Sequence, residues 1–440
     1  MNRKVLLMIV RIIVSVGLIV YVCTKIKLDD ALVRTDGTRA VGRLIRGEQG
    51  PATFGLRTNE GVEVRLASGE LLKDKDGRLV GVERGIITVF RDIKLAWFVP
   101  AFLIMGLIPL IGATRFRWLL AVQGVHITLG RSLQLTFLGN FFNNFMLGLT
   151  GGDVVKAYSV ARETHKRTEA VITVFLDRIV GLVALALLAA LMVAINYRDP
   201  KFAGAALYVW AFLVGAIFIT LTLYSRTLRH KVHYTIFGVL LAGGGFILFW
   251  RVSEKGWPAT RLEAIAFAVA LAVAGLFAFV RPLRLLFQLH KFRMWLARNR
   301  MVREMDATFS TFSRDPRASI LSLAISFGCH VTTIFGIFGF ARALGIAAPI
   351  NYFLVFVPVI VMVAAIPVSL AGWGVQEAVF QVFFGAVGVN ATEAVTLSFV
   401  YRLSYAVLWS LPGGVVMMLS KDRTSPHDAE QAMAEAEEAI

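Results

Sequence analysis

Residues 170–195 read AVITVFLDRIVGLVALALLAALMVAI, and this stretch decides the class of the protein. Its only charged residues are Asp177 and Arg178, and a helix of about 20 predominantly apolar residues is long enough to cross a membrane. The chain of 440 residues is 57% hydrophobic and only 17% charged, with a mean hydropathy of +0.69. These values exclude a soluble globular protein of this length.

Seven further stretches resemble the first in length and composition. They cover residues 5–24, 95–113, 205–224, 235–250, 262–280, 318–343 and 394–419. We therefore expect an all-α polytopic membrane protein with about eight transmembrane helices.

The charge balance indicates how these helices are oriented. Lys and Arg number 46 and Asp and Glu number 29, so the net charge is +17. In a soluble protein this excess would favour nucleic acid as a partner, but in membrane proteins Lys and Arg concentrate in short cytoplasmic loops. Basic loops at 114–131, 156–167 and 281–317 predict a multi-pass protein with both termini cytoplasmic and no nucleic-acid partner.

The composition divides the chain into four parts. Residues 1–28 form the first transmembrane helix, 95–420 the membrane domain, and 421–440 an acidic cytoplasmic tail. Residues 29–94 carry short β-like runs at 42–45, 62–67, 71–73 and 78–82, separated by turn signals. We expect them to form a small β-rich extracytoplasmic insert.

Two apolar segments are interrupted in their middle. Residues 132–150 are flanked by basic loops on both sides, which predicts a re-entrant hairpin covered by protein. The second segment, 351–389, starts and ends outside, and a broken helix or two tightly turned full spans fit it equally well. The interruptions are Gly139, Asn140, Asn143, Asn144 and Gly148 in the first segment, and Pro367, Gly372 and Gly374 in the second.

Arg178 is expected close to the membrane midplane, roughly 12 Å into a helix that starts near Ala170. An arginine at that depth costs several kcal/mol unless it faces a polar interior, so it is a functional candidate by default. The alternative is that a carboxylate neutralises Arg178 and the pair merely ties helices together. Asp177 points about 100° away, so such a partner must come from another segment.

The second half of the chain repeats this pattern. Arg402 lies in the last apolar stretch, 28 positions after Gly374, and Arg178 lies 26 positions after Gly152. Two broken helices with opposite entry faces are typical of an inverted-repeat transporter. Two matches at loose spacing are also compatible with unrelated segments.

These features together predict a site for an anionic lipid head group. Backbone N–H groups and helix N-termini at the breaks, with Arg178 and Arg402, can bind a phosphate. Asp153 and Glu377 are candidates for a counter-charge, a cationic head-group site or a proton relay, and a helix cap is at least as good an interpretation of each. The substrate-binding candidates are Asn140, Asn143, Asn144, Gly151, Gly152, Asp153, Lys156, Asp177, Arg178, Ser369, Gly372, Gly374, Glu377, Tyr401 and Arg402.

The same motifs resemble the flippase-like membrane domain of lysylphosphatidylglycerol synthases over roughly residues 95–419. The resemblance rests on residues 139–145 (GNFFNNF), 151–153 (GGD), 176–178 (LDR), 367–378 (PVSLAGWGVQEA) and 401–403 (YRL). It implies an integral protein of the plasma (inner) membrane with a role in moving or handling lipids, including aminoacylated phosphatidylglycerol and, in other members, isoprenoid-linked or hopanoid lipids. The chain departs from the family pattern at Leu147, Lys156 and Gln376, where the family often has Pro, Arg and Arg. The short acidic stretch after residue 420 leaves no room for the aminoacyltransferase domain of full synthases.

A lipid translocator that is not an enzyme is therefore the leading hypothesis. A membrane-embedded enzyme acting on a polyprenyl or phospholipid phosphate, with Asp153 or Glu377 as base, is a second hypothesis. A non-transporting membrane partner protein is the third. No catalytic motif occurs, and we expect no cofactor and no metal site. The expected partners are anionic or isoprenoid-linked membrane lipids, with a second copy of the chain as a further candidate.

Overall fold

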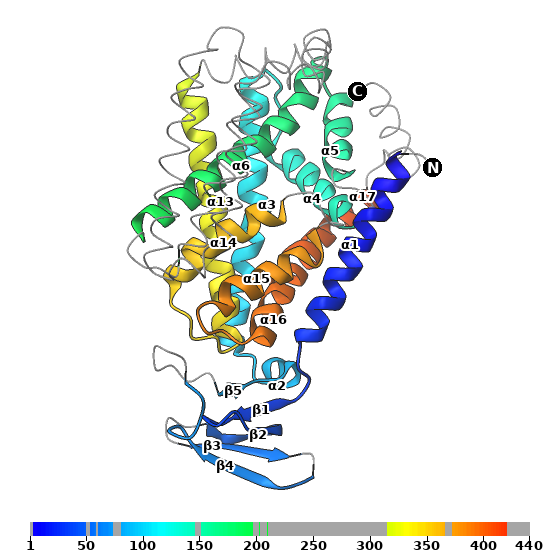
Figure 1. Ribbon diagram of the computed structural model, residues 1–440. Helices are drawn as coiled ribbons and strands as arrows, with labels where there is room; N and C mark the ends of the chain where they lie inside the picture. The colour runs from blue at the N-terminus through cyan, green and yellow to red at the C-terminus, as the bar shows by residue number, and fades with distance from the viewer. Residues whose placement is uncertain are drawn as a thin grey trace, which may run out of the picture.

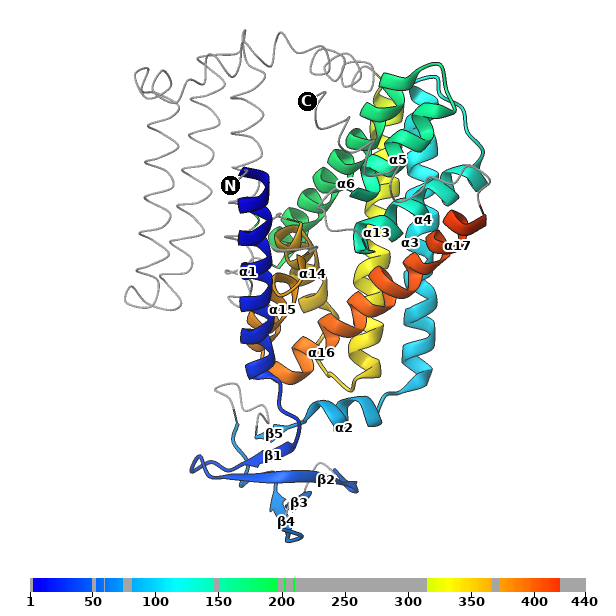
Figure 2. The ribbon, with the colours of Figure 1, turned by 90° about the vertical axis from the view of Figure 1, so that its right-hand side faces the viewer.

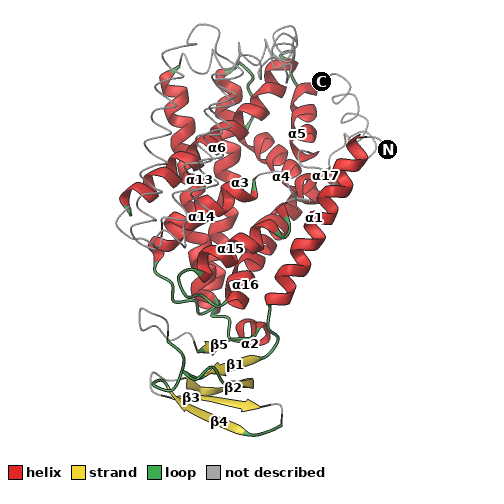
Figure 3. Ribbon diagram, viewed as in Figure 1, coloured by secondary structure: helices red, strands yellow, loops and turns green. Residues whose placement is uncertain are grey.

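The computed structural model describes residues 3–49, 53–58, 60–73, 81–145, 151–196, 202, 209, 315–365 and 372–419. Within these residues the protein is mostly helical, with one small β-sheet at one end of the helical bundle (Figure 1). Helices and strands occupy separate regions of the molecule (Figure 3).

Four helical segments of the described chain are long and apolar enough to cross a membrane. Three are single helices, α3 (Leu95–Val122), α6 (Arg167–Ile195) and α13 (Pro316–Ala343). The fourth runs through α16 (Ala391–Arg402), η3 (Leu403–Val407), η4 (Leu408–Ser410) and α17 (Leu411–Leu419). With α1 (Arg3–Lys25), five of the expected spans are helical, and the spans predicted at 205–224, 235–250 and 262–280 lie outside the described residues.

The outer face of α6 shows what surrounds these helices. Exposed apolar side chains recur every four residues along it, at Ile179, Val183, Leu187, Leu191 and Ile195. Residues four apart lie on one face of a helix, so they form a continuous apolar stripe. Such a stripe fits contact with lipid tails.

Two pairs of shorter helices pack between the long ones. The first pair is α4 (Leu129–Phe145) with α5 (Gly151–Arg162), and the second is α14 (Ile350–Ala364) with α15 (Val375–Gly385). They contain 17, 12, 15 and 11 residues, so each is at most about 26 Å long and shorter than a hydrocarbon core of about 30 Å. Two full spans within 351–389 are therefore ruled out as straight crossings.

The predicted break inside 132–150 is partly wrong. Helix α4 continues without interruption through Gly139, Asn140, Asn143 and Asn144, and the second arm of the hairpin is α5, which the sequence placed in a loop. Helix α4 tolerates these residues because their groups are used in packing and hydrogen bonds: the amide of Asn144, for example, donates to the backbone oxygen of Asn140 at 2.8 Å.

The described elements follow the same order twice. A long helix, two short ones and a long segment occur as α3–α4–α5–α6 and again as α13–α14–α15–α16/α17. The two long segments of each set have 28 and 29 residues. Figure 1 shows α5 in the half of the bundle far from the sheet and α15 in the half near it.

The two sets run in opposite directions. Lys94 at the start of α3 donates its N–H to the oxygen of Ala343 at the end of α13, at 2.9 Å. Further along the contact, Met105 lies against Gly336, and the Cys329 sulfur is 4.0 Å from the oxygen of Ile108. Residue numbers rise along α3 as they fall along α13, so the two helices are antiparallel.

The sheet has five antiparallel strands in the order β4-β3-β2-β1-β5. They are β1 (Asp30–Val33), β2 (Arg39–Gln49), β3 (Thr53–Thr58), β4 (Glu63–Ala67) and β5 (Val82–Glu83). The predicted runs 42–45 and 62–67 match β2 and β4, whereas the run 71–73 forms no strand: Leu71 and Lys73 are isolated bridge residues, and Leu71 pairs with Arg34. Most of the run 78–82 lies outside the described residues, and β1 and β3 were not predicted.

The sheet lies at one end of the helical bundle, below it in Figure 2, and polar contacts attach it there. The Asp30 carboxylate accepts hydrogen bonds from the N–H groups of Leu44 and Gly85, at 2.8 and 2.7 Å, and from the Thr88 hydroxyl of α2 (Ile86–Arg91), at 2.7 Å. Arg84 donates to the oxygen of Leu344 at 2.8 Å. The sheet is thus tied to α2 and to the end of α13.

Candidate functional site

An ion pair joins the first hairpin to a long helix. Asp153 in the first turn of α5 pairs with Arg178 on α6, so the partner of Arg178 comes from another segment, as expected. The Asp153 side chain is 12% exposed, whereas that of Arg178 is 50% exposed. Half of the Arg178 side chain is thus left uncovered by the protein.

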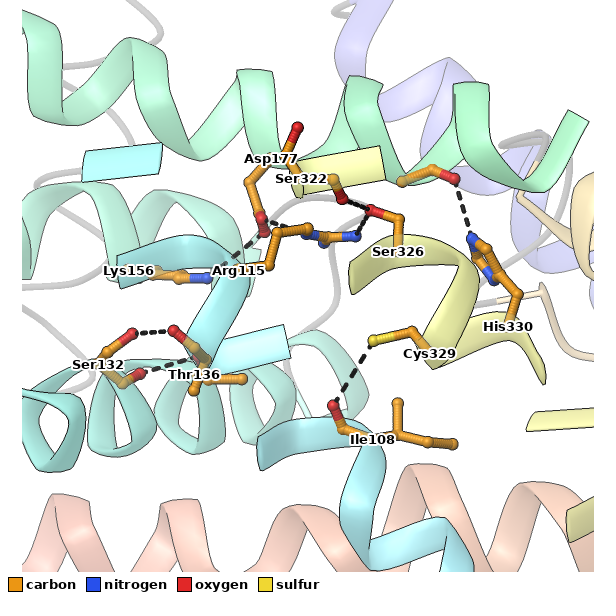
Figure 4. Close-up of polar contacts among 12 residues, drawn as sticks. Ile108, Arg115, Ser132, Thr136, Lys156, Asp177, Ser322, Ser326, Cys329 and His330 are labelled. Atoms are coloured by element: carbon orange, nitrogen blue, oxygen red, sulfur yellow. Dashed lines mark hydrogen bonds and ion pairs between the residues drawn. The ribbon is translucent and has the colours of Figure 1, made fainter. Parts of the chain in front are cut away.

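A second ion pair lies beside the first and is more enclosed. Arg115 on α3 donates from Nε to Asp177 Oδ1 at 2.7 Å, and from Nη1 to the Ser326 hydroxyl of α13 at 2.8 Å (Figure 4). Gly181, one turn after Asp177, leaves space for the guanidinium, because a Cβ atom there would lie 3.2 Å from Arg115 Nη1. This pair holds α3, α6 and α13 together.

Lys156 on α5 approaches the same carboxylate from another side (Figure 4). Its Nζ lies 3.8 Å from Asp177 Oδ2, beyond hydrogen-bond distance, and 3.5 Å from the centre of the Phe116 ring. The side chain is only 8% exposed. Cation–π contact stabilises a buried ammonium partly, but it does not neutralise the charge.

Arg115 and Lys156 correct the sequence-based topology. Both were assigned to cytoplasmic loops, Arg115 because the apolar run appeared to end at Ala113. In the structure α3 continues to Val122, with Phe116, Leu119 and Leu120 fully buried. The spacing of these three residues was the available signal that the helix continues past Arg115.

The glycines and asparagines of the first hairpin hold its two arms together. The N–H of Gly152 donates to Asn143 Oδ1 at 3.0 Å. A Cβ atom at Gly152 would overlap the backbone oxygen of Gly139, so α4 and α5 touch through their backbones. Gly151 begins α5. Of the predicted ligands in this hairpin, Gly152 and Asn143 therefore have a structural role in the described protein.

The corresponding pair in the second half is buried. Arg402 at the end of α16 donates from Nε to Glu377 Oε1 at 2.9 Å and from Nη2 to the oxygen of Gly372 at 3.0 Å. Its guanidinium carbon lies 4.6 Å from the centre of the Trp373 ring. The side chains of Arg402 and Glu377 are 7% and 8% exposed. Arg402 thus contacts a carboxylate, a backbone oxygen and an aromatic ring at once.

Glu377 also caps the helix that carries it. Its Oε2 accepts a hydrogen bond from the N–H of Gly374 at 2.8 Å, in the turn that starts α15. Gly372 and Gly374 have φ of 74° and 83°, a backbone conformation that favours glycine. The cap interpretation is therefore confirmed for Glu377. Ser369, another candidate, lies outside the described residues.

Aromatic side chains connect the two arginine sites. Tyr401 is buried and stacks on Tyr405, with ring centres 6.0 Å apart. Tyr405 in turn lies within electrostatic range of Arg115 and Arg178. It belongs to η3, a π-helical turn of the kind that often occurs at functional sites.

Comparisons with known proteins agree with this architecture. The model of the lysylphosphatidylglycerol synthase transmembrane region matches residues 83–235 and 230–413. A UPF0104 membrane protein of Pyrococcus horikoshii is 22% identical over 350 residues, which cover 78% of this chain and 92% of the relative. No solved structure matches the chain significantly.

Proposed function

The chain belongs to the family of the lysylphosphatidylglycerol synthase transmembrane region, and on this premise we propose that it is a lipid translocator with a head-group site centred on Arg178. The family and the apolar helices make it a multi-pass membrane protein. The observation that carries the proposal is the half-exposed side chain of Arg178, which pairs with Asp153 and lies in the apolar part of α6, where Asp177 is the other charged residue.

Arg178 suits a phosphate ligand for two reasons. A guanidinium binds phosphate through two parallel hydrogen bonds, which are among the strongest in proteins. The exposed part of the side chain is free to make such bonds while Asp153 keeps the arginine oriented. The acyl tails of the lipid would remain in the bilayer, against apolar stripes such as that of α6.

The repeated element order supports transport. Two sets of helices that run in opposite directions, each with a hairpin of short helices, are the arrangement expected of an inverted-repeat transporter. We place the protein in the plasma (inner) membrane with both termini cytoplasmic and the sheet outside, because this orientation puts the basic loops in the cytoplasm.

An enzyme is the weaker proposal. Asp153 and Glu377, the two candidate bases, each form an ion pair with an arginine. Each carboxylate is thus already bound by a guanidinium rather than left open to a reacting group. The partner-protein hypothesis has no support from the sheet, whose buried polar contacts serve to attach it.

The test is transbilayer exchange of labelled phospholipid and polyprenyl phosphate in liposomes that contain the purified protein. We expect exchange of an anionic lipid, abolished by Arg178→Ala and retained by Arg131→Ala. Arg131 is a matched control because it forms an ion pair with Glu163 on the surface of the first hairpin. Mass spectrometry of the same samples detects conversion: unaltered lipid supports a translocator, and a chemically altered product would establish an enzyme.

A further inference from the structure

Five charged groups of the described residues meet around α5 and α6, and the charges of these five do not balance. The cations are Arg115, Lys156 and Arg178, and the anions are Asp153 and Asp177. Arg178 is paired with Asp153, and Arg115 with Asp177. The surplus cation is Lys156, whose described contacts are the Phe116 ring and Asp177 at 3.8 Å.

Lys156 is placed to change partners. Asp153 and Lys156 are three residues apart on α5, so they lie on the same face of the helix. The Lys156 ammonium interacts electrostatically with both Asp153 and Asp177. A change of side-chain rotamer would move it from one carboxylate toward the other without any movement of the helix.

We propose that the site binds a lipid with one net negative charge. When the lipid phosphate binds Arg178, Asp153 is released and forms an ion pair with Lys156 instead. The inference rests on the proposed function and names its substrate class. In the bound state each of the three cations has its own anion. Arg178 pairs with the phosphate, Lys156 pairs with Asp153, and Arg115 pairs with Asp177. No group loses or gains a proton.

The charge count selects among lipid head groups. A phosphodiester with an uncharged substituent carries one negative charge and balances the cluster. A phosphomonoester carries roughly two negative charges at neutral pH, so the cluster with this lipid bound has one excess negative charge. A zwitterionic phosphodiester leaves the surplus cation unbalanced. Unbalanced buried charge is unfavourable, so the monoanion binds most tightly.

The test is binding of fluorescent phosphatidylglycerol to the purified full chain in uncharged detergent. Lys156→Met removes the surplus cation, so the bound lipid would leave Asp153 without a partner unless it took up a proton. We expect binding to weaken roughly tenfold or more at neutral pH and to recover as the pH falls to about 5. Wild-type binding should change little over the same range.

Among the described residues, Arg178 on α6 pairs with Asp153, and Lys156 lies on the same face of α5. Arg115 on α3 and Asp177 on α6 belong to the same cluster, and α4 contributes the amide oxygen of Asn143, which accepts from the N–H of Gly152. The arginines keep their charge throughout this pH range. In Lys156→Met, Asp153 is the carboxylate that loses its partner, and it is therefore assigned as the proton acceptor.

Two further variants distinguish a loss of binding caused by the missing charge from a loss caused by misfolding. The double variant Lys156→Met/Asp153→Asn has one surplus positive charge again, so it should regain most of the affinity and lose the pH dependence. Lys156→Arg keeps the charge and should rescue binding relative to Lys156→Met. Phosphatidic acid and phosphatidylcholine, as dianionic and zwitterionic probes, should bind more weakly than phosphatidylglycerol.

The outcomes distinguish this inference from the proposed function. Suppose that lipid binding depends on Arg178, but that Lys156→Met binds as tightly as the wild type at every pH. This result would overturn the inference and leave the proposed function standing. So would a double variant that binds no better than Lys156→Met, or a preference for the dianionic or zwitterionic probe. If Arg178→Ala binds phosphatidylglycerol as tightly as the wild type, the proposed head-group site fails as well.

Discussion

The two arginine–carboxylate pairs have equivalent positions but different surroundings. In each, 25 positions separate the carboxylate from the arginine, from 153 to 178 and from 377 to 402. Arg178 and Arg402 are each the twelfth residue of their helix. Yet the side chain of Arg178 is 50% exposed and that of Arg402 only 7%.

This difference indicates a division of roles within one repeated framework. Arg402 contacts a carboxylate, a backbone oxygen and an indole ring, so its release would disrupt several interactions at once. Arg178 has one described ion-pair partner and an exposed side chain. Under the proposed function, the first pair exchanges its carboxylate for a ligand, whereas the second pair holds the α15 turn against α16.

Arg402→Ala should give the largest loss of stability. It leaves Glu377 buried without its counter-charge, for which about 3–5 kcal/mol is typical. Thermal unfolding of the variant in detergent measures the effect. If Arg402→Ala were no less stable than Arg178→Ala, the distinction between a fixed and an exchangeable pair would be lost.

Arg115→Met should destabilise the protein by less, about 2 kcal/mol, because Lys156 still faces Asp177 after the substitution. The same unfolding measurement applies, with Lys156→Met for comparison. A combined Arg115→Met/Lys156→Met variant should lose more than the sum of the single effects, because Asp177 then has neither cation. Simple additivity would show that Lys156 does not compensate.

Gly152→Ala should open the first hairpin, since the new Cβ atom overlaps the Gly139 oxygen. Overpacking of this kind costs typically about 1–3 kcal/mol. Gly112→Ala on α3 is the matched control, because a Cβ atom there meets nothing within 4 Å. Equal stabilities of the two variants would contradict the close approach of α4 and α5.

Arg178→Ala should have the smallest effect on stability, about 1 kcal/mol, because Arg178 is half exposed and Lys156 remains near Asp153. Its effect on lipid movement should nevertheless be complete. Unfolding and transbilayer exchange measured on one preparation reveal this contrast. A variant that unfolds readily yet still moves lipid would reverse the roles assigned to the two arginines.

The sequence predicted the long helices well, because runs such as 170–195 are apolar throughout and their length alone indicates a span. It also indicated that Arg178 and Arg402 lie inside membrane helices, because a charged residue within an apolar run is easily recognised. The small sheet was found only in part: β2 and β4 alternate or follow turn signals, while β1 has only four residues and β5, one of its two neighbours in the sheet, lies far along the chain.

The rest of the site depended on packing that a sequence pattern does not reveal. Arg115 and Lys156 occur where apolar character fades, and such positions are read as loops by composition. Gly139 and Asn143 suggested a helix break, but a neighbouring helix uses the first for close approach and the second as a hydrogen-bond acceptor. Tertiary contacts thus override local propensity here.

The most direct test is photo-crosslinking of the purified protein with phosphatidylglycerol that carries a photoreactive group on its head. Peptide mass spectrometry then locates the modified residues. We predict modification of α5 and α6 around Arg178, lost in Arg178→Ala and retained in Arg131→Ala. Modification concentrated on α15 and α16 around Arg402, or unchanged by Arg178→Ala, would contradict the assignment of Arg178 as the head-group site.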